Sequence, residues 1–527
     1  MRVRRLRPVP LSRDAYPGPQ CAVRSGRGTA WGRLARGRRC AVVFAAVFAW
    51  LVCVGLWQVG KPMPEGTYVR TPAVTVAARD VRFLHDLTYQ APDGGIVHQQ
   101  QIFDEVLEII DAAETFIVAD FFLINDRMGA AGGAHRHLSV ELASHLMTRK
   151  AARPELSILL LTDPINDVYG GAPLPLFDDL REAGIQVVTT ALQPLRDPNP
   201  AWSAPWRVFA QWWGNSSEGG RLPNPFASGD AGISLRSWLT LVNFKANHRK
   251  LIVADRADGD LTVLVTSANP HDASSAHSNV ALRFSDAPGD TGGLAQRILD
   301  SELAVARFSG WAGSIGPGKT RAADTASDPV QLSFLTEQAI RDHLLQALDA
   351  ARARDRARIA VFYLSDRRVI EGLLAAAARG VEVRVILDPN RDAFGLEKDG
   401  VPNRPVANEL VTRSGGRIAV RWYRTHGEQF HSKIMLVTRG DRLIASLGSA
   451  NFTRRNLGNY NLEANIAMES DVRSAPARAM VAWFDRLWEN DDPAGAVFTA
   501  DFDAWRDTSR ARYWRYRIME ATGLSTF

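Results

Sequence analysis

Most of this 527-residue chain has no cysteine. The three cysteines, Cys21, Cys40 and Cys53, all lie in a basic leader or in the apolar run that follows it. The residues after Cys53 therefore form no disulfide among themselves, no thiolate metal site and no cysteine nucleophile. A body without thiols suits an oxidising compartment but does not require one.

Positive charge is also scarce outside the first 39 residues. Residues 1–39 contain eleven Arg and one Asp, whereas the rest of the chain has 52 basic and 56 acidic residues, a net charge of −4. Nucleic-acid binding depends on Lys and Arg that neutralise phosphates, so this balance predicts no nucleic-acid partner. Lysine is rare throughout, with seven residues against 56 Arg.

One long uncharged run covers residues 40–60. As a helix it would extend about 30 Å, the thickness of a bilayer's hydrocarbon core. Several Arg precede the run and only Lys61 directly follows it. By the positive-inside rule this predicts a single-pass anchor in the inner membrane of a bacterial cell, with the leader cytoplasmic and the body extracytoplasmic. The alternative is a cleaved signal peptide, but no small-x-small cleavage site follows the run.

The body contains the same order of elements twice. Each half has an amphipathic helix, a buried apolar strand, a second helix, a strand that ends in Asp-Pro, a further strand and a closing helix. In the first half these begin near residues 99, 115, 137, 156, 185 and 293, and in the second near residues 337, 358, 369, 381, 417 and 475. Strands that alternate with helices predict the α/β class, with two duplicated α/β/α lobes, each a mixed sheet flanked by helices, after an N-terminal transmembrane helix.

This pattern also predicts the domain boundaries. We expect a leader at 1–39, the anchor at 40–60, a first lobe at 80–308, a linker at 309–328, a second lobe at 329–490 and a C-terminal extension at 491–527. The first lobe has an insertion at 193–240 that holds five of the fourteen tryptophans. This insertion is either a lip that meets lipid or a loop that packs its aromatic side chains on the body. Residues 505–518 interleave Arg with aromatics, which predicts either a docked helix or a contact with anionic headgroups.

A histidine-x-lysine pair occurs in the closing part of each half. The first pair is His248 and Lys250, and the second is His431 and Lys433. Alternation along a strand places the two side chains of each pair on one face. A Ser-Ala-Asn segment follows each pair, with Ser267 and Asn269 in the first half and Ser449 and Asn451 in the second. The chain has only seven lysines, and two of them, Lys250 and Lys433, occupy matching positions in the repeat. This coincidence predicts a functional site.

Such a site suits phosphoryl transfer at a phosphodiester. Lysine and asparagine side chains neutralise and orient the phosphate oxygens, where charge develops in the transition state. One histidine can attack phosphorus and form a covalent intermediate. The other can protonate the leaving alcohol and later deprotonate the incoming water or alcohol. This chemistry needs no metal and no cofactor, and the sequence has no clustered carboxylates that would hold a metal.

The pattern resembles the phospholipase D superfamily, whose signature is His-x-Lys-x4-Asp followed by a Gly-Ser-x-Asn type segment. The resemblance covers most of residues 80–490 and occurs twice, as in the bilobal members. It implies that both histidines face one phosphate and that a phosphohistidine forms. By position it assigns nucleophile and general acid to His248 and His431, phosphate binding to Lys250, Lys433, Asn269 and Asn451, and supporting positions to Ser267 and Ser449. Asp255 completes the first motif and is counted among the catalytic residues that the resemblance implies.

The chain departs from the family pattern at three places. Thr438 replaces the aspartate of the second motif, and Thr266 replaces the glycine of the first. The family's later acidic residue, which orients a histidine, matches Glu463, whereas residues 276–279 of the first half offer no carboxylate. An oriented imidazole is the better nucleophile, which indicates His431, but the family more often uses the N-terminal histidine. The two roles stay open.

Two other patterns do not predict a site. Residues 313–320 match the P-loop letter for letter, but a P-loop needs a strand directly before it and a helix after it, and neither is expected here. His135 and His137 lie in a Gly/Ala-rich stretch and are expected to be solvated rather than metal ligands.

The function predicted from residues and resemblance is a membrane-anchored enzyme that acts on phospholipids. It would be a phospholipase D or a phosphatidyltransferase of the cardiolipin synthase type, with phospholipid and the bilayer as its partners. The alternatives are a nuclease of the same superfamily, which the acidic body disfavours, and a pseudoenzyme that only binds lipid. The sequence gives no prediction of headgroup, acceptor or oligomeric state.

Overall fold

The computed structural model describes residues 30–127, 135–226, 232–286, 293–316, 328–393 and 396–527. The chain divides into two compact units, residues 1–52 and residues 53–527. Helix α1 (Ala30–Gly60) begins in the first unit and ends in the second. Among the described residues, its segment Arg38–Gly60 is the one helix that is long and apolar enough to cross a membrane by length and composition.

The first lobe is built on an eight-stranded sheet with the order β3-β2-β9-β8-β7-β4-β5-β6. Its strands are rich in aliphatic residues, and β5, β7 and β8 are buried along nearly their whole length, as expected for strands covered on both faces. The strands are β2 (Val81–Gln90), β3 (Ile96–Gln99), β4 (Phe116–Phe121), β5 (Ser157–Thr162), β6 (Gln186–Thr189), β7 (Lys250–Asp255), β8 (Leu261–Thr266) and β9 (Asn279–Asp286).

The second lobe is built on a nine-stranded sheet with the order β1-β10-β18-β17-β16-β11-β12-β15-β19. The strands are β1 (Val74–Ala77), β10 (Pro329–Leu335), β11 (Arg356–Val361), β12 (Glu382–Leu387), β15 (Ile418–Tyr423), β16 (Lys433–Arg439), β17 (Arg442–Gly448), β18 (Asn465–Asp471) and β19 (Thr499–Asp501). A separate two-residue hairpin joins β13 (Asp392–Ala393) to β14 (Leu396–Glu397).

Seven strands of each sheet repeat one another in order and direction. The run β2-β9-β8-β7-β4-β5-β6 corresponds to β10-β18-β17-β16-β11-β12-β15. In both runs the last three strands pair in parallel and the others pair antiparallel. The predicted duplication and the mixed α/β class are therefore confirmed.

The extra strands at the sheet edges come from segments that the repeat does not predict. β1 lies before the first lobe in the chain but pairs with β10 of the second sheet. β19 belongs to the C-terminal extension and pairs with β15 at the other edge of the same sheet. Both ends of the body are thus joined to the second lobe.

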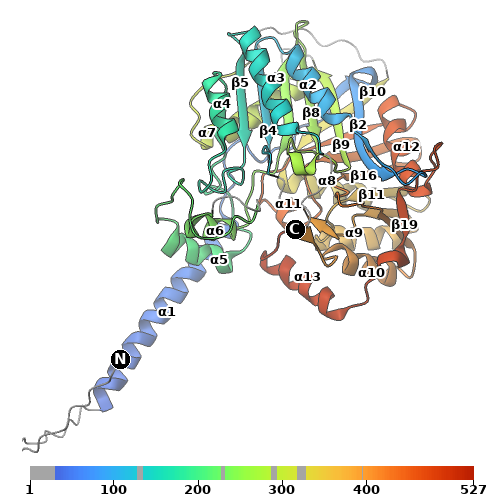
Figure 1. Ribbon diagram of the computed structural model, residues 1–527. Coiled ribbons are helices and arrows are strands. Elements are labelled where there is room, and N and C mark those ends of the chain that lie inside the picture. Colours follow the sequence, from blue (N-terminus) through green and yellow to red (C-terminus); the bar gives the residue numbers. More distant parts are fainter. Residues whose placement is uncertain (1–29, 128–134, 227–231, 287–292, 317–327, 394–395) are drawn as a thin grey trace, which may run out of the picture. The chain divides into compact units, whose positions relative to one another are not determined.

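Helices repeat with the strands. In the first lobe they are α2 (Ile102–Ala112), α3 (Leu138–Ala152), α4 (Pro175–Glu182) and α7 (Leu294–Phe308), and in the second α8 (Glu337–Ala350), α9 (Arg367–Ala378), α10 (Asn403–Arg413) and α12 (Ala475–Glu489). In α2, buried apolar side chains recur at three- and four-residue spacing, so one face packs on the sheet. Figure 1 shows α2 and α3 over the first lobe at the top and α9 and α10 over the second lobe at the bottom.

Three apolar clusters fill the body. One packs α2, α3 and α4 on the first sheet, and another packs α8, α9 and α10 on the second. The third contains α7 and α12 together with strands of both sheets, and it joins the lobes. Strands β8 and β9 of the first lobe contact β17 of the second lobe at the boundary between the two sheets. The lobes therefore share one continuous core.

The aromatic insertion and the C-terminal extension carry short helices. The insertion contains α5 (Pro200–Pro205), a π-helical turn η2 (Trp206–Ala210) and α6 (Leu235–Leu241). The extension contains α13 (Arg510–Thr522), which follows β19 and docks through the buried side chain of Tyr516. Residues 1–29 of the leader and residues 317–327 of the linker lie outside the described residues.

Candidate active site

The two histidines lie at equivalent positions, directly before the central strands β7 and β16. The residue before each histidine forms a bridge with the other lobe, Asn247 with Leu462 and Phe430 with Ser278. The backbone N–H of His248 also donates to the Leu462 carbonyl at 2.8 Å. The start of each central strand is thus held against the opposite lobe.

Each imidazole finds its partner across the lobe boundary. The Nδ1 of His248 lies 2.9 Å from Oε2 of Glu463, and the Nδ1 of His431 lies 3.1 Å from Oδ1 of Asn279. Asn279 and Glu463 are equivalent in the repeat, since each accepts a hydrogen bond from the serine of its own lobe. Ser267 donates to Asn279 at 2.9 Å, and Ser449 donates to Glu463 at 2.6 Å.

This geometry corrects the sequence interpretation of Glu463. Its carboxylate contacts His248 of the first lobe and not His431, so the argument that indicated His431 as the nucleophile loses its basis. The error arises because the sequence analysis paired each acidic residue with the histidine of its own half. The contact depends on how the lobes pack, which no spacing along the chain reveals.

Glu463 is fully buried, and both oxygens of its carboxylate accept hydrogen bonds. Burial alone would raise its pKa, but His248, Lys250 and Ser449 together hold the pKa below its usual value. Its other oxygen accepts from Asn456. Because an ionised carboxylate only accepts hydrogen bonds, the Nδ1–H of His248 is the donor and Nε2 carries the free lone pair.

The lysines sit under the histidines in matching contacts. Nζ of Lys250 donates to the carbonyl of His248 at 2.7 Å, and Nζ of Lys433 donates to that of His431 at 2.6 Å. Each lysine also makes a cation–π contact. Nζ of Lys250 lies 5.0 Å from the ring centroid of Phe122, and Nζ of Lys433 lies 5.3 Å from that of Phe362.

The same two phenylalanines also contact the imidazoles. Ring centroids are 4.8 Å apart for Phe122 and His248, and 5.1 Å apart for Phe362 and His431. Sequence reasoning missed both residues. Each directly follows a strand at the same place in the repeat, β4 or β11, and this was the signal that could have found them.

Burial lowers the pKa of both histidines and of both lysines. It lowers the pKa of His248 to about 4, and Lys250 and Lys433 add to the effect while Glu463 opposes it. It also lowers the pKa of His431 well below its usual value, with Lys433 and His277 contributing. Burial lowers the pKa of Lys250 to about 7 and that of Lys433 well below its usual value. Both imidazoles are therefore neutral at pH 7, and a bound anion would raise the pKa of both lysines.

The two asparagines of the Ser-Ala-Asn segments are each 6% exposed. The Oδ1 of Asn269 accepts from the backbone N–H of Leu123 at 3.3 Å. The Oδ1 of Asn451 is buried and has no hydrogen-bond partner among the described residues. Both amides lie on the loops that follow β8 and β17, with Ser267 and Ser449 before them.

Asp255 lies away from this group. It ends β7, about 17 Å along the strand from Lys250. Its carboxylate accepts from the backbone N–H groups of Thr115 at 2.9 Å and Phe116 at 3.0 Å, and from the Thr115 hydroxyl at 2.7 Å. We therefore assign Asp255 a structural role at the start of β4, which differs from the catalytic role implied by the motif.

The second lobe replaces this contact with a different one. At the equivalent end of β16, Thr438 accepts from Arg358 at 3.3 Å, and Arg358 pairs with Asp485 at 2.9 Å. The loss of the motif aspartate therefore changes a distant support and leaves His431 and Lys433 in place.

Two further carboxylates hold the histidine segments, and the sequence analysis did not propose them as site residues. Asp163 accepts from the backbone N–H of Asn247 at 2.7 Å, and Asp388 accepts from that of Phe430 at 2.8 Å. Burial raises the pKa of Asp163 to about 8 and that of Asp388 to about 7. The Asp-Pro pair at the end of one strand in each half was the signal for this shared role.

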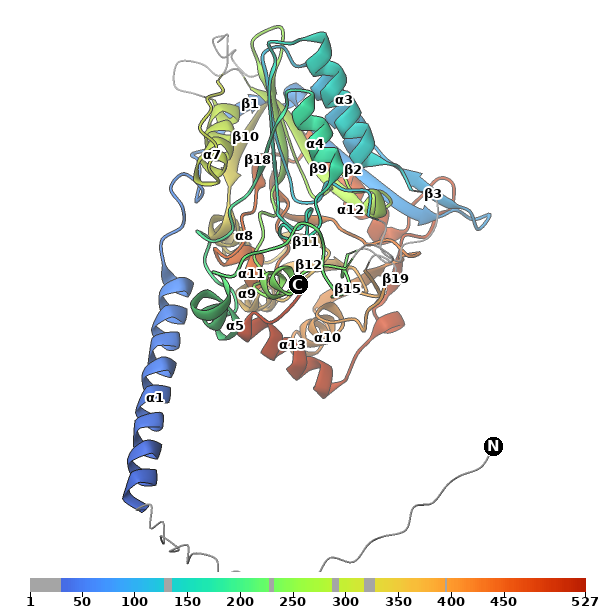
Figure 2. The same ribbon diagram turned by 60° about the vertical axis from the view of Figure 1, so that its left-hand side comes forward.

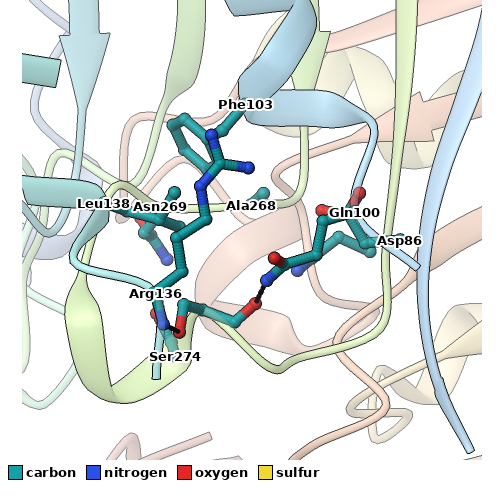
Figure 3. A pocket seen from close by; sticks show the side chains of 10 residues that line it. Asp86, Gln100, Phe103, Arg136, Leu138, Ala268, Asn269 and Ser274 are labelled. Carbon is teal, nitrogen blue, oxygen red and sulfur yellow. Dashed lines mark hydrogen bonds between the residues drawn. The ribbon is translucent and has the colours of Figure 1, made fainter. Parts of the chain in front are cut away.

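A small pocket adjoins the site on the first-lobe side (Figure 3). It is lined by Asp86, Gln100, Phe103, Arg136, Leu138, Ala268, Asn269, Ser274, Ser275 and Asn279. Its polar walls are paired with their surroundings: Gln100 donates to the Ser275 carbonyl at 2.6 Å, and Arg136 pairs with Asp104 at 2.7 Å. The pocket therefore extends the polar surface beside Asn269 without adding a separate reactive group.

The remaining sequence signals give no second site. Of the P-loop-like segment, residues 317–320 lie outside the described residues, and the element before the segment is helix α7 instead of the strand that a P-loop needs. His137 contacts the buried Asp272 at 2.9 Å. The described part of the chain contains no group of three or more His, Cys, Asp or Glu side chains placed to hold a metal ion.

Fold and site define a two-lobed α/β protein in which paired His and Lys side chains from both lobes converge. The family model "Cardiolipin synthase, PLD-like domain" matches residues 344–488. Cardiolipin synthase A of Pseudomonas syringae pv. syringae (strain B728a) is 24% identical over 399 residues, which cover 74% of this chain and 68% of that protein.

A solved structure shares the fold over nearly its whole length. Phosphatidylserine synthase of Haemophilus influenzae superposes with a TM-score of 0.52 and 10% identity, covering 86% of this chain and 97% of that one. At this identity the likeness concerns the fold. Together with the duplicated motifs, the family model and the curated relative support the resemblance of the chain to the phospholipase D superfamily.

Proposed function

We propose that this protein is a membrane-anchored phosphatidyltransferase of the cardiolipin synthase type, which acts through a phosphohistidine intermediate. The observation that carries the proposal is the cross-lobe site, in which two neutral imidazoles and two buried lysines converge. The matching family model and the curated relative favour phospholipid as substrate. Helix α1 supplies a segment able to hold the body at a bilayer.

We assign the nucleophile to His248. Its Nδ1–H is donated to Glu463, so Nε2 presents its lone pair and the carboxylate stabilises the cation that forms when Nε2 bonds to phosphorus. As this N–P bond forms, the bond from phosphorus to the headgroup oxygen breaks. Lys250, Lys433, Asn269 and Asn451 are the donors for the phosphate oxygens during this displacement.

His431 is the general acid and base. It gives its proton to the departing headgroup oxygen and then removes a proton from the acceptor alcohol or water, whose oxygen attacks phosphorus and releases His248. Burial lowers the pKa of His431 and keeps it neutral at pH 7, and Lys433 and Lys250 add to this effect. An anionic phosphodiester offsets the repulsion from the lysines and raises the pKa of His431, so the acid form accompanies bound substrate.

The product identifies the reaction. Purified protein in mixed micelles with phosphatidylglycerol, phosphatidylethanolamine and glycerol would be analysed by lipid mass spectrometry. Cardiolipin is the expected product, and it should be absent with His248→Ala and with His431→Ala. Phosphatidic acid alone would identify a hydrolase instead. No change in any lipid would overturn the proposal for these substrates and direct attention to other diesters.

The two histidine roles are separated by the leaving group. In a phosphatidyl ester of p-nitrophenol the leaving group is p-nitrophenolate, which departs without being protonated. Cleavage of this substrate therefore does not need the general acid. We expect His431→Asn to lose about 10²- to 10⁴-fold in turnover of phosphatidylglycerol but to retain release of p-nitrophenol in a single burst. His248→Asn should neither turn over phosphatidylglycerol nor release p-nitrophenol. A burst from His248→Asn, with none from His431→Asn, would reverse the assignment.

A further inference from the structure

The aromatic insertion presents large apolar side chains to solvent. Phe209 is 52% exposed, Trp212 77% and Trp213 51%. All three lie within five residues of one another, in η2 and the turn that follows it. We call these three residues the aromatic tip. A clustered apolar surface of this kind on a folded protein marks a contact with a partner or a membrane.

The aromatic tip is held in a defined shape. Arg236 of α6 lies over the ring of the buried Trp206, 5.0 Å from its centroid. The same guanidinium donates to the carbonyl of Gln211 at 3.0 Å and to that of Trp213 at 3.3 Å. The backbone that carries the exposed rings is therefore held by contacts behind it, and the exposure of these rings belongs to the folded structure.

The insertion is also bonded to the last turn of α1. The backbone N–H of Asp197 donates to the carbonyl of Gln58 at 3.1 Å, and Lys61 donates to that of Gln193 at 2.9 Å. Nε of Arg196 in turn donates to the Lys61 carbonyl at 2.6 Å. Figures 1 and 2 both show α5 beside this end of the helix. The start of the insertion, residues 193–197, is thus in contact with the C-terminal end of the apolar helix.

The last turns of α1 are themselves apolar and exposed, with Leu56 71% and Trp57 64% accessible. A tryptophan at the end of a membrane-crossing helix sits at headgroup level, where its ring is partly in lipid and its N–H meets water. An insertion bonded to residues 58–61 lies at the same level. At this level the partner that contacts the exposed aromatic rings is the phospholipid bilayer.

We propose that Phe209, Trp212 and Trp213 enter the headgroup region of the bilayer beside α1, as a second membrane contact of the body. This inference rests on the proposed anchoring of the chain by α1. A second contact would fix the orientation of the body relative to the bilayer, because a single helix leaves the tilt of the body free and two contacts restrain it.

The insertion connects this contact to the catalytic strand. Asp197 forms ion pairs with Arg207 at 2.6 Å and with Lys245 at 3.0 Å, and all three side chains are buried. Lys245 precedes His248 by three residues. The segment that meets lipid is therefore packed against the residues that lead into the site.

A fluorescent probe at the tip tests the contact. In the full-length chain with Cys21, Cys40 and Cys53 replaced by alanine, a single cysteine at Trp212→Cys would carry an environment-sensitive dye. In nanodiscs of phosphatidylglycerol and phosphatidylethanolamine we expect a blue shift, and quenching when spin-labelled lipid is included. The matched control is Val140→Cys on α3, which is 52% exposed and should show neither effect.

Retention in nanodiscs separates the two ideas. A retained chain whose label at position 212 behaves like that at position 140 would overturn the aromatic tip and leave the anchor standing. A chain that purifies free of lipid and detergent as a soluble protein would overturn the anchoring itself.

Activity gives a second readout. Replacing both exposed tryptophans, Trp212→Ser with Trp213→Ser, should raise the KM for bilayer phosphatidylglycerol roughly tenfold. The kcat/KM for a short-chain phosphatidylglycerol, dispersed as monomers, should stay unchanged. An equal loss on both substrates, or none on either, would contradict the inference.

Discussion

At the scale of single residues, the two histidines differ in the side chain that accepts their Nδ1 proton. His248 donates to a carboxylate and His431 to an amide. A carboxylate stabilises an imidazolium far better than an amide does, so the two halves of a duplicated site are chemically unequal. In the mechanism proposed above, this single difference between equivalent positions, Glu463 against Asn279, is what separates the nucleophile from the general acid.

The titration of Lys250 and His248 predicts a bell-shaped pH dependence of kcat/KM. His248 attacks only when neutral, which holds above a pKa of about 4, and Lys250 attracts phosphate only when charged, which holds below a pKa of about 7. We therefore expect kcat/KM to rise near pH 4 and to fall above pH 7. Bound phosphate raises the pKa of Lys250, so the fall in kcat should come at higher pH. Coinciding limbs for kcat and kcat/KM would contradict this account.

At the scale of elements, a buried ion cluster joins four segments behind the site. Arg249 lies between His248 and Lys250 but points the other way, and its side chain is fully buried. It pairs with Glu302 of α7 at 2.9 Å and with Glu337 of α8 at 3.2 Å, and it donates to the carbonyl of Thr67 at 3.0 Å. Glu337 also accepts from the backbone N–H of Glu463 at 3.1 Å. The cluster therefore fixes both the histidine strand and the residue that orients His248.

Removing the arginine should strongly destabilise the fold. Arg249→Met leaves two buried carboxylates without their cation, and breaking a buried ion pair in this way costs about 3–5 kcal/mol. Denaturant unfolding in detergent would measure the change in the free energy of unfolding. The matched control is Arg256→Met, just past the other end of β7, whose 39% exposed side chain lies 3.7 Å from Asp258 and should contribute less than about 1 kcal/mol. Similar losses for the two variants would show that the cluster is not a special support.

At the scale of the whole molecule, the lobes depend on each other. Their shared core includes Leu251 and Phe284 of the first lobe and Phe430 and Leu447 of the second. The hydroxyl of Tyr423 crosses the boundary to donate to the carbonyl of Thr88 at 2.6 Å. Each lobe also supplies the partner of the other lobe's histidine, so neither contains a complete site.

This shared core predicts cooperative unfolding. Calorimetry of the full-length protein in detergent should show one transition for the body, because exposing the boundary of one lobe removes packing from the other. Arg249→Met should lower the temperature of that single transition and leave it undivided. Two resolved transitions would indicate that the lobes fold as independent domains.

The repeat made much of the fold predictable. Helices at α2, α3, α8, α9, α7 and α12 and the strands between them follow from apolar periodicity, which is a local property of the chain. β1 and β19 escaped prediction because each is short and pairs with a strand far away in sequence. Of the site, the His, Lys and Asn residues were found because their types and spacing occur twice.

What the sequence determined by itself is the inventory: two lobes of one plan, two His–Lys pairs and one long apolar helix. The tertiary structure alone decided that Glu463 serves His248, that Asn279 serves His431 and that Asp255 stands apart from the site. The physical reason is the range of the interactions. Periodicity and motif spacing record contacts within one element, whereas the partner of a buried imidazole depends on how two sheets pack, and that packing brings together residues more than 150 positions apart.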